Sequence, residues 1–139
     1  MGRMVILDVE IAGHAKNALF TGYQVVNMTA IALAESGGDT HAVNVVDKNP
    51  AAASYRSLDL GLWQINTYWW PGPIPDRLNP ATCARIAFDI WRNRFNDART
   101  DGKSWSEASE HAYGAWNVYE SGAYKQYIPR AKTAAAALG

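Results

Sequence analysis

The chain has 139 residues, and its 48% hydrophobic content is enough for one domain with its own core. Thirteen basic and thirteen acidic residues cancel, which excludes the broad positive field that nucleic-acid binding exploits. Cys83 is the only cysteine, so no internal disulfide can form. We therefore expect residues 1–139 to form one domain, a monomer that needs no cofactor.

Along the first third of the chain, apolar spacing and helix-ending glycines predict two helices, at about 8–20 and 23–36. The second is apolar almost throughout, which predicts burial on most sides. Residues 39–57 are polar and irregular, apart from a β-prone VNVV at 43–46 and a turn signal at Asn49-Pro50. This region is predicted as either a small β-hairpin or a loop.

The remainder is predicted to be mainly helical. Asn79 and Pro80 open a helix that reaches about Phe95. A capping box at Ser104 predicts a further helix over 105–116. The last segment, 121–138, is predicted as helix with a break or kink near Pro129.

Glu35 is the most informative single residue, because its carboxyl group follows an apolar run at the C-terminal end of a helix. Burial and the negative end of the helix dipole both disfavour the anion, so both raise the pKa toward a value useful to a general acid. The same position also suits a solvated glutamate at a frayed helix end.

Two sequence blocks carry a resemblance to the lysozyme superfamily. The stretch 35–44 resembles the region around the catalytic acid of animal-type lysozymes, with matches at Glu35, Ser36, Thr40, Ala42 and Asn44. The second block resembles the family pattern Asp-x-Gly-x-x-Gln-Ile-Asn-x-x-Trp-Trp, with matches at Asp59, Gly61, Gln64, Ile65, Asn66, Trp69 and Trp70. Both blocks are also similar to signatures of lytic transglycosylases and of lysozyme-like domains in phage tail proteins.

The late segment Tyr119-Glu120-Ser121-Gly122 is similar to the Tyr-Asn-x-Gly of transglycosylase domains, with Glu120 in place of asparagine. Animal lysozymes also carry several disulfides, whereas Cys83 stands alone here. Phage and bacterial relatives tolerate this difference, so the resemblance favours them.

The resemblance implies a mainly α (α+β) fold, in which a helical body and a small irregular or β-hairpin lobe flank a substrate cleft. It implies that Glu35 is the general acid and Asp59 the second carboxylate in peptidoglycan cleavage. Side chains expected to bind substrate are Asn44, Gln64, Asn66, Trp69, Trp70 and Trp116. Of the two adjacent tryptophans, one is expected to belong to the core.

Three functions are compatible with these residues. The first is a muramidase that hydrolyses the bond between N-acetylmuramic acid and N-acetylglucosamine, and the second is a lytic transglycosylase that forms a 1,6-anhydro ring. The third is a wall-binding or virion structural domain without activity. Asp59 favours the muramidase, because transglycosylases typically rely on one carboxylate.

The expected partner is the glycan strand of peptidoglycan, with no nucleic acid and no membrane insertion. The amino terminus is neither a convincing signal peptide nor a membrane span. Action at the bacterial wall would therefore require phage delivery, release during lysis, or a larger parent protein.

Other reactive side chains have structural interpretations. His14, His41 and His111 lack metal-ligand spacing, so no metal is expected. Cys83, in the first turn of a capped helix, is interpreted as a buried structural thiol. Tyr113 and Trp116 are expected on one helix face, either in the core or beside the acid.

Overall fold

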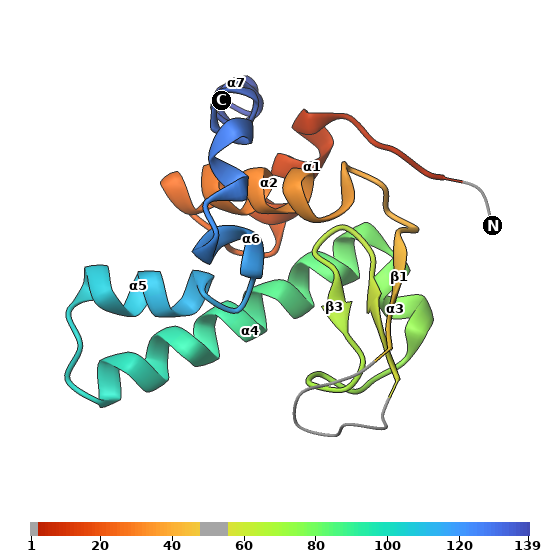
Figure 1. The fold of residues 1–139 in the computed structure, drawn as a ribbon. Helices are drawn as coiled ribbons and strands as arrows, with labels where there is room; N and C mark the ends of the chain where they lie inside the picture. The colour runs from red at the N-terminus through yellow and green to blue at the C-terminus, as the bar shows by residue number, and fades with distance from the viewer. Residues whose placement is uncertain (1–2, 48–55) are drawn as a thin grey trace.

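A computed structural model describes residues 3–47 and 56–139 (Figure 1). The fold is 60% helical with a small three-stranded antiparallel sheet, which confirms the mainly α (α+β) prediction. The helices are α1 (Asp8–Asn17), α2 (Tyr23–Ser36), α3 (Ile74–Leu78), α4 (Pro80–Thr100), α5 (Trp105–Tyr113), α6 (Asn117–Glu120), the 3₁₀ helix η1 (Ala123–Tyr127) and α7 (Ile128–Ala137). The strands are β1 (Val43–Val46), β2 (Ser57–Leu60) and β3 (Ile65–Asn66).

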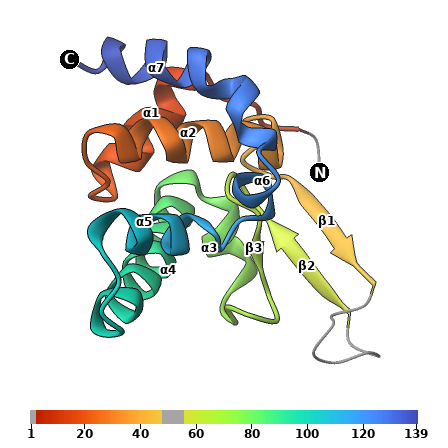
Figure 2. The same cartoon turned by 60° about the vertical axis from the view of Figure 1, so that its left-hand side comes forward.

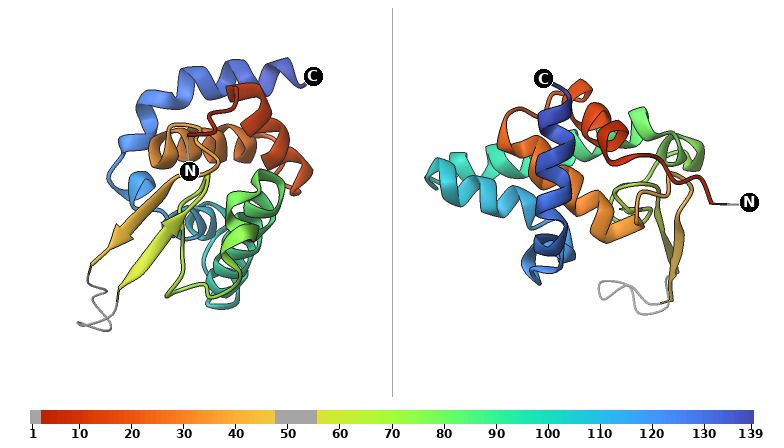
Figure 3. Two further views of the ribbon diagram at one scale, coloured as in Figure 1. Left: turned by 90° about the vertical axis from the view of Figure 1, so that its right-hand side faces the viewer. Right: turned by 90° about the horizontal axis from the view of Figure 1, so that it is seen from above.

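Helix α2 is central because its sequence is apolar on nearly every side, as predicted. It packs against α1 and α7, which pack against each other, and Figures 2 and 3 show α7 lying across these two helices. On the exposed side, Arg130 of α7 forms two hydrogen bonds to the Asp8 carboxylate, at 2.9 and 2.8 Å. These bonds join the first and last helices, and both pack against α2, which contains Glu35 near its C-terminal end.

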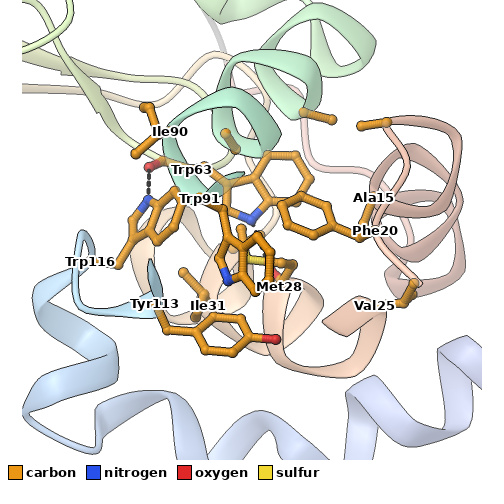
Figure 4. Packing of buried hydrophobic residues seen from close by; sticks show 14 of the residues in the cluster. Ala15, Phe20, Val25, Met28, Ile31, Trp63, Ile90, Trp91, Tyr113 and Trp116 are labelled. Carbon is orange, nitrogen blue, oxygen red and sulfur yellow. Dashed lines mark hydrogen bonds between the residues drawn. The ribbon is translucent and has the colours of Figure 1, made fainter. Parts of the chain in front are cut away.

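The core that α2 shares with α4 and α5 is rich in aromatic side chains (Figure 4). Trp63 is fully buried, and its indole N–H donates to the carbonyl oxygen of Met28 in α2 at 2.9 Å. The indole N–H of Trp116 donates to the carbonyl oxygen of Trp63 at 2.9 Å, the dashed line in Figure 4. These bonds connect α2 to the segment before β3 and to the start of α6.

The sheet has the order β1-β2-β3. It places Asn44 opposite Asp59, and Asp59 opposite Asn66. Residues 43–46 are therefore a strand, as the β-prone VNVV indicated, whereas the turn signal at Asn49-Pro50 lies outside the described residues. Helix α5 and the sheet lie at opposite sides of the molecule in Figure 1.

Two helix boundaries differ from the prediction. Helix α1 ends at Asn17 instead of Phe20, because Leu19 adopts a left-handed backbone with a φ of 89°. Helix α4 continues to Thr100, past Phe95, since the intervening residues include no proline or glycine. The sequence also gave no indication of α3, a single short helix with proline in its first turn.

The C-terminal helices also begin and end differently. Helix α5 stops at Tyr113, so Tyr113 and Trp116 do not share a helix face, although both are buried. The predicted break near Pro129 is confirmed, because the 3₁₀ helix η1 ends at Tyr127 and α7 starts at Ile128. Pro129 lies in the first turn of α7, where a proline removes no internal hydrogen bond. Among the described residues, no helix is long and apolar enough to cross a membrane.

Candidate active site

The end of α2 positions Glu35. Ser36 closes the helix by donating its hydroxyl to the carbonyl oxygen of Ala32 at 2.9 Å and accepting from the N–H of Gly38 at 3.2 Å. Gly37 then takes a left-handed conformation, with a φ of 64°, that few other residues adopt without strain. The backbone of Glu35 is consequently held at the end of the helix, directly before the chain turns toward the sheet.

The sheet positions Asp59, and Asn66 holds its carboxylate. The Asn66 amide donates to Asp59 at 2.8 Å and to the Ser57 hydroxyl at 3.0 Å. The side-chain carbonyl oxygen of Asn66 accepts from the backbone N–H groups of Tyr68 and Trp69, at 2.9 and 3.2 Å. Asn66 thus couples Asp59 to the loop that carries the tryptophans.

Gln64 is also held by hydrogen bonds. Its amide donates to the carbonyl oxygens of Ala42 and Gly61, at 3.2 and 2.9 Å. Its own oxygen accepts from the amide of Asn44 at 2.6 Å. Because the amide protons and the oxygen are engaged within the protein, Gln64 shapes the sheet end of the site.

A hollow of about 640 Å³ brings most of the predicted site residues together. The α2 end and the sheet line one part of it, and α4 with the α5–α6 connection lines another. Its lining consists of Glu35, Val46, Asp59, Gln64, Ile65, Asn66, Trp69, Trp70, Ile90, Arg94, Gly114, Ala115, Trp116 and Asn117. Both carboxylates therefore face one open space.

The two adjacent tryptophans differ in exposure, but neither is wholly a core residue as one was expected to be. Trp69 is 53% exposed at the hollow. Trp70 also lines it but packs against the hydrophobic core. An exposed indole beside a hollow is suited to stacking on the apolar face of a sugar.

Electrostatics separate the two acids. Burial, followed by the negative charge of Asp59, raises the pKa of Glu35 to about 7. Burial also raises the pKa of Asp59, but the hydrogen bond from Asn66 acts in the opposite direction by stabilising the anion. The arrangement can therefore present a protonated carboxyl group near neutral pH opposite a hydrogen-bonded carboxylate.

Arg77 holds the tryptophan loop in place, and no sequence motif pointed to this role. Its buried guanidinium donates to the carbonyl oxygens of Trp70 and Pro73, at 2.8 and 2.9 Å. A Cβ at Gly72 would collide with this guanidinium, and one at Gly61 would collide with the Arg77 carbonyl oxygen. Both glycines are thus required for close packing around α3.

Asn44 does not line this hollow. It borders a separate one with Asp39, His41 and Leu78, and contacts the site through Gln64. Conversely, Arg94 and Asn117 line the main hollow although no sequence motif singled them out. Asn117 directly follows Trp116, just after the glycine that interrupts the helix, and this position could have indicated a site residue. Glu120, in the segment similar to transglycosylases, does not line the hollow.

The remaining reactive side chains lie apart from the site. Cys83 is fully buried, and burial raises the pKa of its thiol to about 11, in agreement with a structural thiol. Within residues 3–47 and 56–139, no three His, Cys, Asp or Glu side chains gather closely enough to hold a metal ion.

A comparison with known proteins finds a family whose pattern matches this chain. The family described as "Lysozyme like domain" matches residues 12–107, a span that includes Glu35, Asp59 and both loop tryptophans. Searches of curated proteins and of solved structures find no match. Domains of this family generally act on peptidoglycan as glycosidases or transglycosylases. With more than half of its length matched and the mainly α fold of the family, the chain belongs to the lysozyme-like domain family.

Proposed function

We propose that the protein is a muramidase, which hydrolyses the β-1,4 bond between N-acetylmuramic acid and N-acetylglucosamine. The observation that carries this proposal is the pair Glu35 and Asp59, which line one hollow from different elements and have different electrostatic environments. Glycoside hydrolysis requires one proton-donating carboxyl group and one carboxylate at the scissile bond.

In this mechanism Glu35 donates its proton to the glycosidic oxygen as the bond to the anomeric carbon breaks. Asp59 stabilises the positive charge that develops on the sugar, or attacks the anomeric carbon to form a glycosyl-enzyme intermediate. Water then supplies the hydroxyl group of the new reducing end, and its released proton restores Glu35.

Three other side chains support these steps. Asn66 keeps the Asp59 carboxylate oriented through its hydrogen bond. Trp69 and Trp116 contribute aromatic walls to the hollow where sugar rings would lie. Since peptidoglycan lies in the bacterial cell wall, we propose that the protein acts there, delivered by a phage, released during lysis or carried by a larger chain.

Product analysis tests the proposal against the transglycosylase alternative. Wild-type protein is incubated with purified peptidoglycan, and the sugar fragments are identified by mass spectrometry. A hydrolase leaves reducing muramic acid ends, whereas a transglycosylase leaves 1,6-anhydro ends that are lighter by one water. We expect reducing ends.

Variants of the two carboxylates complete this experiment. Glu35→Gln should lower turnover by roughly 10² to 10⁴. Asp59→Asn should lower kcat strongly with little change in binding, because the lost charge acts mainly in the transition state. Asp97→Asn, an exposed change on α4 outside the hollow, is the matched control. Anhydro products together with an active Asp59→Asn variant would establish a transglycosylase instead.

A further inference from the structure

Arg94 is a cation inside the candidate active site for which cleavage of the glycan provides no role. It lies on α4, one turn beyond Ile90, and both side chains line the hollow. Among the described residues of the lining it is the one basic residue, whereas Glu35 and Asp59 are acidic. Arg94 belongs to the wall of the hollow that α4 and the α5–α6 connection form, and Asp59 belongs to the wall that the sheet forms.

Within the described part of the chain, one hydrogen bond orients the guanidinium. Its Nε–H donates to the carbonyl oxygen of His111 in α5 at 2.9 Å. Among the described residues, Arg94 makes no further hydrogen bond, and no carboxylate lies within 4.0 Å of it. The two Nη groups therefore remain available as a pair of parallel donors.

Gly114 leaves space next to these donors. A Cβ at this position would lie 3.4 Å from an Nη atom of Arg94 and 2.9 Å from a carboxylate oxygen of Glu120. Glu120 is thus the neighbouring negative charge, yet it stays beyond ion-pair distance. A ligand carboxylate could approach the guanidinium from the hollow without displacing an existing ion pair.

Holding Arg94 in this place has a cost. The side chain is half-buried, and burial lowers its pKa. Hydroxyl groups of uncharged sugars can accept hydrogen bonds from neutral donors as well, so they do not require a half-buried cation. Planar guanidinium groups bind carboxylates through two parallel hydrogen bonds, which supply both affinity and orientation.

We propose that Arg94 binds a carboxylate on the muramic acid side of the glycan strand, making the site selective for acidic wall glycans over neutral chitin. This inference rests on the proposed function, since it assigns a substrate group to the same hollow. Two carboxylate sources share the required chemistry. One is the lactyl group of muramic acid, and the other is the stem peptide attached to it.

Binding to a catalytically inactive protein tests this proposal without turnover. Glu35→Gln protein is titrated by calorimetry with three ligands of equal sugar length. Chitotetraose has no carboxylate, the peptide-free tetrasaccharide of alternating N-acetylglucosamine and N-acetylmuramic acid carries lactyl carboxylates, and its peptide-bearing form carries stem-peptide carboxylates.

In this background, Arg94→Gln should weaken binding of the acidic ligands about 10- to 100-fold, the range for hydrogen bonds between charged groups. Affinity for chitotetraose should change less than about twofold. Loss for the peptide-free tetrasaccharide identifies the lactyl carboxylate, and loss for the peptide-bearing form alone identifies the stem peptide. Arg94→Lys, which keeps the charge but not the paired donors, should give an intermediate loss.

Arg92→Gln is the control, because Arg92 lies on the same helix but is exposed and paired with Asp89 at 3.3 Å. Equal losses for all three ligands would mean that Arg94 only supports the end of α5, and unchanged affinities would remove its role altogether. If the Glu35→Gln protein binds none of the ligands, the proposed function fails and this inference fails with it.

Discussion

At the scale of single residues, Glu35 links the proposed chemistry to the stability of the fold. Its pKa is about 7 in the folded protein, against a reference value of 4.5. Below about pH 4.5 the group is neutral in both the folded and unfolded states, so it costs no stability. As the pH rises to 7 the unfolded chain loses this proton first, so the free energy of unfolding falls until both states are ionised.

Glu35→Gln should therefore stabilise the protein at pH 8 by on the order of 1 to 3 kcal/mol. The larger figure is close to the free energy that corresponds to the whole pKa shift. The smaller figure allows for screening of the charge by solvent. At pH 4 the variant and the wild type should have similar melting temperatures. Thermal unfolding at both pH values checks this, and an equal difference at the two would contradict the burial of the charge.

At the scale of elements, the short helix α3 contributes to the site by carrying Arg77, which holds the tryptophan loop. The buried guanidinium joins α3 to the loop that carries Trp69 and Trp70, without a carboxylate within ion-pair distance among the described residues. Removing it would take away the charged donor of the partly buried hydrogen bonds to the carbonyl oxygens of Trp70 and Pro73.

Arg77→Met should consequently cost about 2 to 4 kcal/mol of unfolding free energy and weaken binding of chito-oligosaccharides. Urea denaturation and calorimetric titration measure the two effects. Arg85→Met, an exposed change on α4, is the control and should stay within about 0.5 kcal/mol. Lost stability with unchanged binding would mean that the loop is positioned by other contacts.

The elements also show why part of the site could be predicted and part could not. The local position of Glu35, at the end of an apolar helix, suggested a general acid but also suited a solvated glutamate, and the resemblance around 35–44 favoured the acid. Asp59 and Asn66 followed from a resemblance, while their direct bond depends on strand register. Arg77 acts through backbone oxygens of the loop and N-cap before α3, and Arg94 acts through α5, 17 residues away. No sequence motif specifies these contacts.

At the scale of the whole molecule, the larger of two buried clusters is rich in aromatic side chains and holds the single cysteine. Cys83 lies within it, fully buried at the first turn of α4. Burial keeps the thiol protonated, with its pKa near 11, so little reactive thiolate forms at neutral pH.

Reducing agents should therefore change neither the melting temperature nor the activity, and native protein should resist alkylation. Cys83→Ala should cost on the order of 1 kcal/mol through lost packing. Melting curves with and without reductant, together with mass measurement after iodoacetamide treatment, check these points. Full inactivation of a folded alanine variant would indicate thiol chemistry.

Because the tryptophans differ in exposure, the intrinsic fluorescence of the protein can report sugar binding. Trp63, Trp91 and Trp116 are at most 5% exposed, whereas Trp69 and Trp105 are 53% and 69% exposed. A soluble quencher such as iodide reaches mainly the exposed pair, of which only Trp69 lines the hollow. Trp105→Phe should leave Trp69 as the main quenchable emitter, and a bound oligosaccharide should then shield most of that emission. Unaltered quenching at saturating ligand would place the sugar away from Trp69.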